Sequence, residues 1–404
     1  MDGLNRIDTA RMVIGGSLMR PLAKMLLVVL MGFALSSFQA SATESQFSTS
    51  PTTNNGQKWR IGYYEGGAHN NYYDYLVATM RGLMVLGWLE NREIPFEKDR
   101  DTEALWQWLG ENVKSDYIEF PKGAYYSAGW DQDVRNTTRD EIVKRLNEKS
   151  DIDVIIAMGT WAGQDLANDR HATPTMVMSS SDPVKSGIIK DVEDSGFDHV
   201  HARVDPFRYE RQVEVFHDII GFKKLGVAFE DSLNGRSYAA IDLIEKVAQN
   251  RGFEVVRCYT QSDIADKTLA GESVKNCFEE LAQEVDAIYV TVQGGVNSET
   301  IPELVAIANE HGVATFSQLG SEEVKYGFLL SISRAGGFKP VGLFLAATAA
   351  KIFNGAKPRQ LNQIFEEVPN LAINLKTAEK VGLYLYAAVL AASDEIYRDI
   401  EVPQ

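Results

Sequence analysis

The stretch DVIIAMGTWAGQDLANDRHATPTMVMSSSDP, residues 153–183, decides the fold of this chain. Two apolar runs, 154–158 and 175–178, flank a segment at 161–168 that has the composition of a helix. Continuous apolar runs of this length, each followed by a glycine or serine turn, are typical of strands buried in a parallel sheet. The stretch therefore predicts strand, helix and strand in a parallel sheet that is covered on both faces.

Polar residues follow both predicted strands. In open α/β sheets, ligands bind beyond the carboxyl ends of the strands, where backbone N–H groups favour an anionic group such as a carboxylate. Ordinary helix capping explains either turn equally well on its own, because serine, threonine and aspartate are the usual N-caps. The residues concerned are Gly159, Thr160 and Trp161 after the first strand, and Ser179, Ser180, Ser181 and Asp182 after the second.

Strand and helix patterns alternate along most of the chain, and the alternation restarts near Asp205. We therefore expect an α/β fold of two doubly wound, Rossmann-like lobes, with a cleft where their strand ends face each other. Two lobes that can hinge are a common device for trapping a solute. Further candidate ligand-binding residues at strand ends are Tyr64, Glu65, Glu230, Asp231, Asn234, Gln293, Asn297 and Gln318.

The first 42 residues have the pattern of a secretory signal peptide. Arg20 and Lys24 precede an apolar run at 25–35, which is followed by an A-x-A cleavage site at 40–42. The run is too short for a comfortable membrane span, and no cysteine near the site offers a lipid anchor. We expect a periplasmic protein that is not inserted in the membrane after cleavage, with a disordered Ser/Thr/Asn/Gln-rich linker at 43–57.

Composition excludes several classes of partner and cofactor. With 404 residues, 45% of them hydrophobic, the chain can bury the cores of two domains, and its net charge of −16 disfavours nucleic acid and anionic lipid as partners. Cys258 and Cys277 could form a disulfide in an oxidising compartment, although we slightly favour two buried thiols, one on a strand and one on a helix. Neither the cysteines nor the histidines have the spacing of a metal site, so we expect no metal and no cofactor.

The sequence carries no motif of a known enzyme class. It contains no GxSxG elbow, Walker loop or GxGxxG fingerprint. Glu65, Asp182 and Asp231 at strand ends could form an acid/base pair, but carboxylates in a binding cleft usually pair with an ammonium group of the ligand. We therefore expect no enzymatic activity.

With these segments assembled, residues 58–385 resemble the periplasmic binding protein type 1 superfamily. Within it they resemble the ABC-transporter substrate-binding family whose better-known members bind tryptophan and related aromatic amino acids. The matching pieces are the Gly-Thr turn after DVIIAM, SDPV at 181–184, DAIYV at 286–290 with the following loop and Asn297, IPELVAIANEHGVATFS at 301–317, and NLAINLKTAEKVGL at 370–383.

The resemblance implies a three-segment hinge, with the chain crossing between lobes near Asp205, Leu330 and Lys357. The lobes would then comprise residues 58–204 with 331–356, and residues 205–330 with 357–404. Three departures concern the ligand rather than the fold. Trp161 stands where members usually have a small residue or proline, EDSLNGRS at 230–237 replaces a proline-containing loop, and the helix around ALWQWLGENV at 104–113 resembles an insertion.

These observations predict a monomeric solute receptor that captures a small polar ligand and delivers it to an ABC permease at the inner membrane. The ligand would be amino acid-like, or a related carboxylate or heterocycle. Glu65, Glu230 or Asp231 would bind its amino group, and Trp161 would either stack on it or fill the space of a bulky ring. The alternative is a periplasmic sensor that partners a membrane histidine kinase or chemoreceptor, which neighbouring genes would distinguish.

Overall fold

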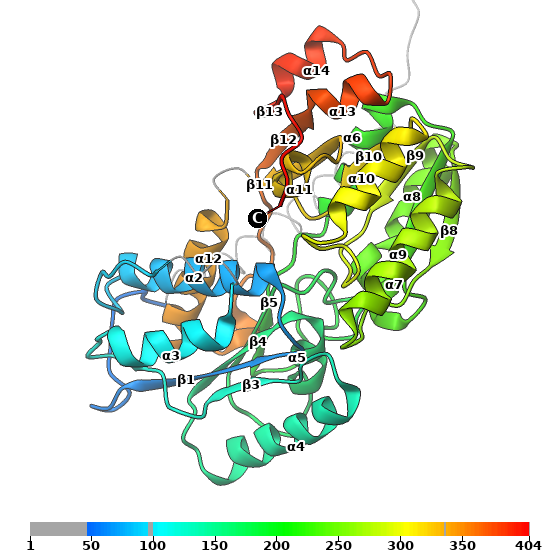
Figure 1. Cartoon of the computed structure of the whole chain (residues 1–404). Helices are drawn as coiled ribbons and strands as arrows, with labels where there is room; N and C mark the ends of the chain where they lie inside the picture. The colour runs from blue at the N-terminus through cyan, green and yellow to red at the C-terminus, as the bar shows by residue number, and fades with distance from the viewer. Residues whose placement is uncertain (1–46, 96–99, 335–336, 404) are drawn as a thin grey trace, which may run out of the picture. The chain divides into compact units, whose positions relative to one another are not determined.

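The computed structural model describes residues 47–95, 100–334 and 337–403. The predicted signal peptide, residues 1–42, lies outside the described residues. Within the described part, no helix is long and apolar enough to cross a membrane. Residues 48–404 form one unit with two lobes, each built around its own sheet (Figure 1).

The sheet of the first lobe has six strands in the order β2-β1-β4-β5-β6, with β3 also pairing with β1. Every pair in it is parallel, as predicted, and β4 and β5 are fully buried. The strands are β1 (Trp59–Glu65), β2 (Ile118–Glu119), β3 (Tyr125–Ser127), β4 (Val154–Met158), β5 (Thr175–Met178) and β6 (Val200–Ala202).

Helices cover this first sheet, and one of them comes from far along the chain. Helix α12 packs against α2, where the Cα atoms of Gly82 and Gly342 leave room for close approach; a Cβ on Gly342 would lie 2.4 Å from the Ala78 carbonyl oxygen. Figure 1 shows the two helices side by side. The helices are α2 (Asn70–Val85), α3 (Thr102–Asn112), α4 (Gln132–Glu148), α5 (Gly159–Leu166) and α12 (Lys339–Phe353).

The sheet of the second lobe has seven strands in the order β13-β12-β11-β10-β9-β7-β8. All pairs are parallel except β11 with β12, which run antiparallel. The strands are β7 (Lys224–Phe229), β8 (Glu254–Tyr259), β9 (Ala287–Val290), β10 (Ala314–Ser317), β11 (Leu330–Arg334), β12 (Pro369–Asn374) and β13 (Glu395–Tyr397).

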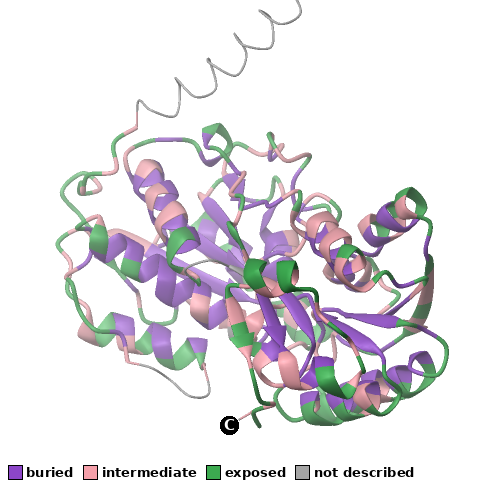
Figure 2. Ribbon diagram, turned by 90° about the horizontal axis from the view of Figure 1, so that it is seen from above, coloured by how far each residue is buried: buried purple, intermediate pink, exposed green. Residues whose placement is uncertain are grey.

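The inner strands β7, β9 and β10 are buried on both faces, which explains their continuous apolar sequences. Alternate residues of β9 point to opposite faces: Tyr289 joins the core under α6 and α8, and Ile288 joins the core under α9 and α10. Figure 2 shows the buried strands between more exposed helices. The helices are α6 (Arg208–Ile220), α7 (Leu233–Ala239), α8 (Ile241–Arg251), α9 (Lys267–Leu281), α10 (Ile301–Glu310), α11 (Ser321–Lys325), α13 (Leu375–Lys380) and α14 (Ala387–Ala392). The short 3-10 turn η1 (Pro358–Gln360) contacts β6 of the first lobe.

Sheet membership shows where the chain passes between the lobes. The first passage follows β6. The second follows β11, which pairs in the second sheet through Arg334, so residues 331–334 do not lie in the first lobe, where the predicted boundary placed them. The third comes after Gln363, whose carbonyl oxygen still accepts from Val204 N–H in the first lobe, and not near Lys357.

Several local predictions need correction. The sequence pattern predicts a strand over residues 360–366, but in the structure this segment forms one isolated bridge, Val204 with Ile364. The pattern also predicts a helix that starts near Arg139, whereas α4 begins at Gln132 because Asp131 caps it. Residues 48–57, predicted to be disordered, contact the end of α12, where the Asn354 amide donates to two backbone carbonyls of that segment.

Cys258 on β8 and Cys277 on α9 form a disulfide, with Cα atoms 5.6 Å apart. Our preference for two free thiols is therefore wrong. The bond joins an edge strand of the second sheet to the helix that follows it.

Candidate functional site

Polar contacts join the two lobes at the carboxyl ends of their parallel strands. Gln164, on α5 of the first lobe, donates to the Asn234 side-chain oxygen on α7 of the second lobe at 2.8 Å. The hydroxyls of Ser186 and Ser237 lie 2.7 Å apart. The strand ends that were predicted to bind a ligand therefore face each other across the lobes.

Asp263 lies at the centre of this facing surface. Its carboxylate accepts hydrogen bonds from Trp161 Nε1 of the first lobe and from the Tyr238 hydroxyl of the second, both at 3.1 Å. Burial raises the pKa of Asp263 to about 6, with a further contribution from the nearby Glu230 carboxylate. The Trp161 and Tyr238 donors are neutral, and the positive charge that acts on Asp263 comes from Arg135, which opposes the rise in its pKa, and from Lys267.

Aromatic rings surround this carboxylate. Trp130 and Trp161 meet edge to face with ring centres 5.4 Å apart, and the Tyr72 ring lies 6.5 Å from Trp130. The ammonium of Lys267, an exposed residue of the second lobe, lies 5.8 Å from the centre of the Trp130 ring. Partial burial lowers the pKa of Lys267, and Asp263 opposes that shift. We call the following six residues the interlobe cluster: Tyr72, Trp130, Trp161, Tyr238, Asp263 and Lys267.

Gly159 is required for this arrangement. Its φ is +85°, which side chains rarely adopt, and a Cβ there would lie 1.9 Å from the Tyr72 hydroxyl. Next to it, the hydroxyls of Thr160 and Ser180 lie 3.2 Å apart, so the two strand ends singled out in the sequence are adjacent.

Glu65, predicted to bind an amino group, has its hydrogen bonds satisfied within the first lobe. Its carboxylate accepts from the hydroxyls of Tyr63 and Thr102 on one oxygen and of Tyr125 and Ser127 on the other. Burial raises the pKa of Glu65, and these hydrogen bonds oppose the shift. Thr102 belongs to α3, so the segment that resembled an insertion supplies part of this network.

Other predicted residues of the first lobe also have internal partners. The Tyr64 hydroxyl donates to Asp165, which forms an ion pair with Arg135. Asp182 accepts two backbone N–H groups from the turn that follows it. Ser179, with a φ of +57°, and Ser181 are half-buried. These residues shape the strand ends, and Trp161 is the one among them that reaches Asp263.

In the second lobe, Glu230 holds the loop that carries Asp263. One oxygen of the Glu230 carboxylate accepts the backbone N–H groups of Ser262 and Asp263 at 2.8 and 2.9 Å. Asp231 is exposed and forms an ion pair with Arg236. Glu230 thus acts on the backbone behind the interlobe cluster.

The amide residues predicted for the second lobe are similarly engaged. Gln293 accepts from the Thr260 hydroxyl at 2.7 Å, and Gln318 donates to the Tyr238 carbonyl oxygen at 2.7 Å. Asn297 accepts backbone N–H groups just before α10 begins. Gln318 therefore supports a member of the interlobe cluster from behind.

Sequence reasoning named Trp161 and missed five members of this cluster as candidate ligand contacts: Tyr72, Trp130, Tyr238, Asp263 and Lys267. The segment at 260–266 follows β8 just as the chosen loops follow their strands. Its position at a strand end could therefore have identified it as a candidate ligand-binding loop. Asp266 is also the N-cap of α9, which begins six residues before the helix start predicted at Ser273.

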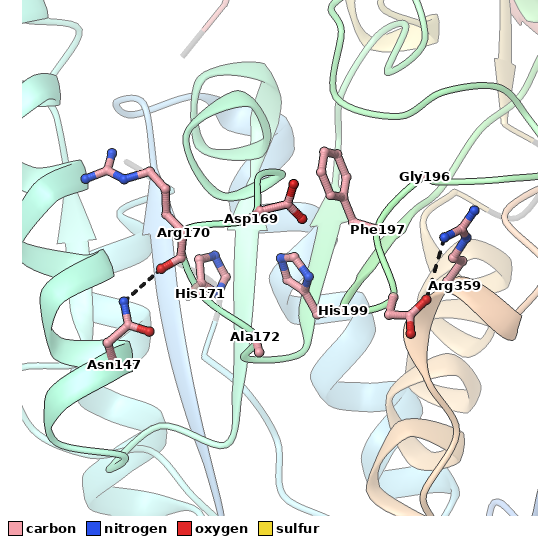
Figure 3. A pocket seen from close by; sticks show the side chains of 10 residues that line it. Asn147, Asp169, Arg170, His171, Ala172, Gly196, Phe197, His199 and Arg359 are labelled. Atoms are coloured by element: carbon pink, nitrogen blue, oxygen red, sulfur yellow. Dashed lines mark hydrogen bonds and ion pairs between the residues drawn. The ribbon is translucent and has the colours of Figure 1, made fainter.

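A separate cavity of about 540 Å³ lies at the other end of the first sheet, next to the amino-terminal ends of β5 and β6 (Figure 3). His171 Nε2 donates to the Leu166 carbonyl oxygen at 3.0 Å. Burial together with the nearby His199 lowers the pKa of His171 to about 4. Among the described residues, no group of three or more His, Cys, Asp or Glu side chains is placed to hold a metal ion. The cavity is lined by Asn147, Asp169, Arg170, His171, Ala172, Gly196, Phe197, Asp198, His199 and Arg359.

The chain has curated and solved relatives. The tyrosine-binding protein of Clostridioides difficile (strain R20291) is 24% identical over 208 residues, which cover 50% of this chain and 52% of that protein. The match thus spans about half the length of that relative. An ABC domain from Streptococcus pneumonia in complex with L-Trp has a TM-score of 0.64 at 18% identity, covering 84% of this chain and 100% of that one.

A ligand-free, open substrate-binding protein with adhesive properties from Clostridium difficile has a TM-score of 0.56 at 20% identity, covering 85% of this chain and 100% of that one. These structural matches confirm the two-lobed α/β fold. A family model described as ABC transporter substrate binding protein matches residues 130–397. That match covers more than half of the sequence, and the chain therefore belongs to the ABC transporter substrate-binding protein family.

Proposed function

We propose that this substrate-binding protein captures an amino acid with an aromatic side chain in the interlobe cluster. The observation that carries the proposal is the Asp263 carboxylate, which lies between the lobes with neutral donors from each of them. A ligand ammonium would give this carboxylate a charged hydrogen-bond donor, and a charge-assisted hydrogen bond is stronger than one between neutral groups.

The rest of the cluster suits the other parts of such a ligand. Trp130 and Tyr72 offer ring faces and edges for an aromatic side chain. The Lys267 ammonium and the hydroxyls of Thr160 and Ser180 offer partners for a carboxylate. The relatives whose names include L-Trp and tyrosine support this class of ligand.

We further propose that the protein works in the periplasm and delivers its ligand to an ABC permease. Family membership supports the permease as partner. The Cys258–Cys277 disulfide suits an oxidising compartment, in agreement with the signal peptide predicted over residues 1–42.

Calorimetric titration with L-tryptophan, L-tyrosine and L-phenylalanine tests the ligand. We expect at least one to bind, and Asp263→Asn to weaken that binding by about tenfold to a hundredfold, because the ammonium would lose its charged partner. Asp133→Asn, an exposed carboxylate on α4, is the matched control and should bind as the wild type does. Absence of binding for all three amino acids, or full affinity in Asp263→Asn, would contradict the proposal.

A further inference from the structure

The disulfide closes a loop that carries both charged residues of the interlobe cluster. Cys258 and Cys277 are 19 positions apart, and Asp263 and Lys267 both lie between them. Cys258 is half-buried on β8, which is an edge strand paired with β7 alone. Cys277 is 2% exposed and packs in the core beneath α9. The bond therefore ties the start of the Asp263 segment to a fixed point in the helix that ends it.

Non-covalent contacts hold the same segment against the rest of the second lobe. Glu230 accepts the N–H groups of Ser262 and Asp263. Gly294 donates its N–H to the Ser262 hydroxyl at 3.0 Å, and a Cβ on Gly294 would lie 2.5 Å from the Ser262 carbonyl oxygen. Gly295 is packed equally closely, against the first turn of α9: a Cβ on Gly295 would lie 2.3 Å from the Ala270 carbonyl oxygen. The segment that carries Asp263 therefore packs closely against Gly294 and Gly295. A small displacement of that segment would break these contacts.

We propose that the Cys258–Cys277 disulfide is a positioning element of the binding site. It holds Asp263 within hydrogen-bonding distance of Trp161, and Lys267 over the ring of Trp130, in the facing lobe. This inference rests on the proposed function. Reduction leaves two thiols, and the end of edge strand β8 is then joined to α9 through non-covalent contacts and the intervening chain. The fraction of molecules with Asp263 correctly placed falls, and apparent affinity falls in proportion to that fraction.

The test compares the oxidised protein, the same protein reduced with a phosphine, and Cys258→Ser/Cys277→Ser. Calorimetry uses whichever of L-tryptophan, L-tyrosine and L-phenylalanine the oxidised protein binds, and hydrogen exchange follows the amides of residues 260–267. We expect affinity about threefold to tenfold weaker in both disulfide-free samples, and faster exchange at Ser262 and Asp263. A core variant, Ile244→Val in α8, controls for general destabilisation: it should lower the melting temperature and leave both affinity and local exchange unchanged.

The two measurements separate the failure of this inference from that of the proposed function. If the oxidised protein binds none of the amino acids, the proposed function fails, and exchange alone then decides whether the disulfide orders the segment. Unchanged exchange at Ser262 and Asp263 without the disulfide overturns the inference, whatever the affinity. Faster exchange with unchanged affinity also overturns it, because the segment would then not position the ligand contacts.

Discussion

Glu65 in the first lobe and Asp263 in the second differ in how many side-chain hydrogen bonds they accept and in which lobe supplies them. Hydroxyls of Tyr63, Thr102, Tyr125 and Ser127 surround Glu65 within its own lobe. Asp263 instead takes one of its donors, Trp161, from across the lobes. Glu65 thus accepts four side-chain hydrogen bonds from its own lobe, whereas Asp263 accepts two, one from each lobe. Position at a strand end alone does not distinguish these two kinds of carboxylate.

The largest expected effect is on the free energy of unfolding, which should respond differently to substitution of Glu65 and of Asp263. Glu65→Gln places an amide NH₂ where the carboxylate accepted hydroxyl protons, so we expect the free energy of unfolding to fall by about 3 kcal/mol. Asp263→Asn should keep its stability within about 1 kcal/mol of the wild type at neutral pH. Urea denaturation measures both. The comparison fails if Glu65→Gln is as stable as the wild type but loses ligand affinity.

The next effect concerns pH. Because burial raises the pKa of Asp263 to about 6, the group loses its charge as pH falls through 6, and affinity for an ammonium ligand should drop by about tenfold per pH unit below that value. A raised carboxyl pKa means that the folded state holds the proton more tightly than the unfolded chain. The contribution of Asp263 to stability is therefore present at low pH and is lost as pH rises through 6. Titrations from pH 4.5 to 8 check the affinity, and Asp263→Asn should show a flat profile.

The smallest effect tests the donor that crosses between the lobes. Trp161→Phe keeps a ring in place but removes the N–H that reaches Asp263, and we expect ligand affinity to weaken by about fivefold. Trp106→Phe is the control, because the buried Trp106 N–H has no hydrogen-bond partner among the described residues. Equal losses in both variants would mean that ring packing, and not the Asp263 contact, determines the affinity.

Much of the fold could be predicted because it depends on local patterns. Buried strands of a parallel sheet are apolar throughout, and a glycine such as Gly159 follows from the turn that ends one of them. The predictions of family and of a non-enzymatic binding protein are confirmed by the family match over residues 130–397. Elements without such a pattern were missed. The three-residue strands β3 and β13 depend on their neighbours more than on their own composition.

The site was harder to predict because its contacts depend on how two lobes meet. Trp161 was named from sequence, but its partner Asp263 lies 102 positions away in a loop that β8 and α9 position. Conversely, Glu65 and Glu230 stand at strand ends, as predicted, yet they support backbone and side chains of their own lobes. Sequence spacing indicates at which end of a strand a residue lies. It cannot indicate which hydrogen-bond partners that residue has within its own lobe.

Helix α12 has a consequence for how this protein reaches its folded state. The helix begins at Lys339, yet it packs on α2 of the first lobe, whose last strand, β6, ends at Ala202. During synthesis the chain therefore displays an unfinished apolar surface on its amino-terminal half until nearly all of the polypeptide has been made. Such a delay postpones folding of the first lobe and prolongs the interval in which the exposed surface of the nascent chain needs chaperones.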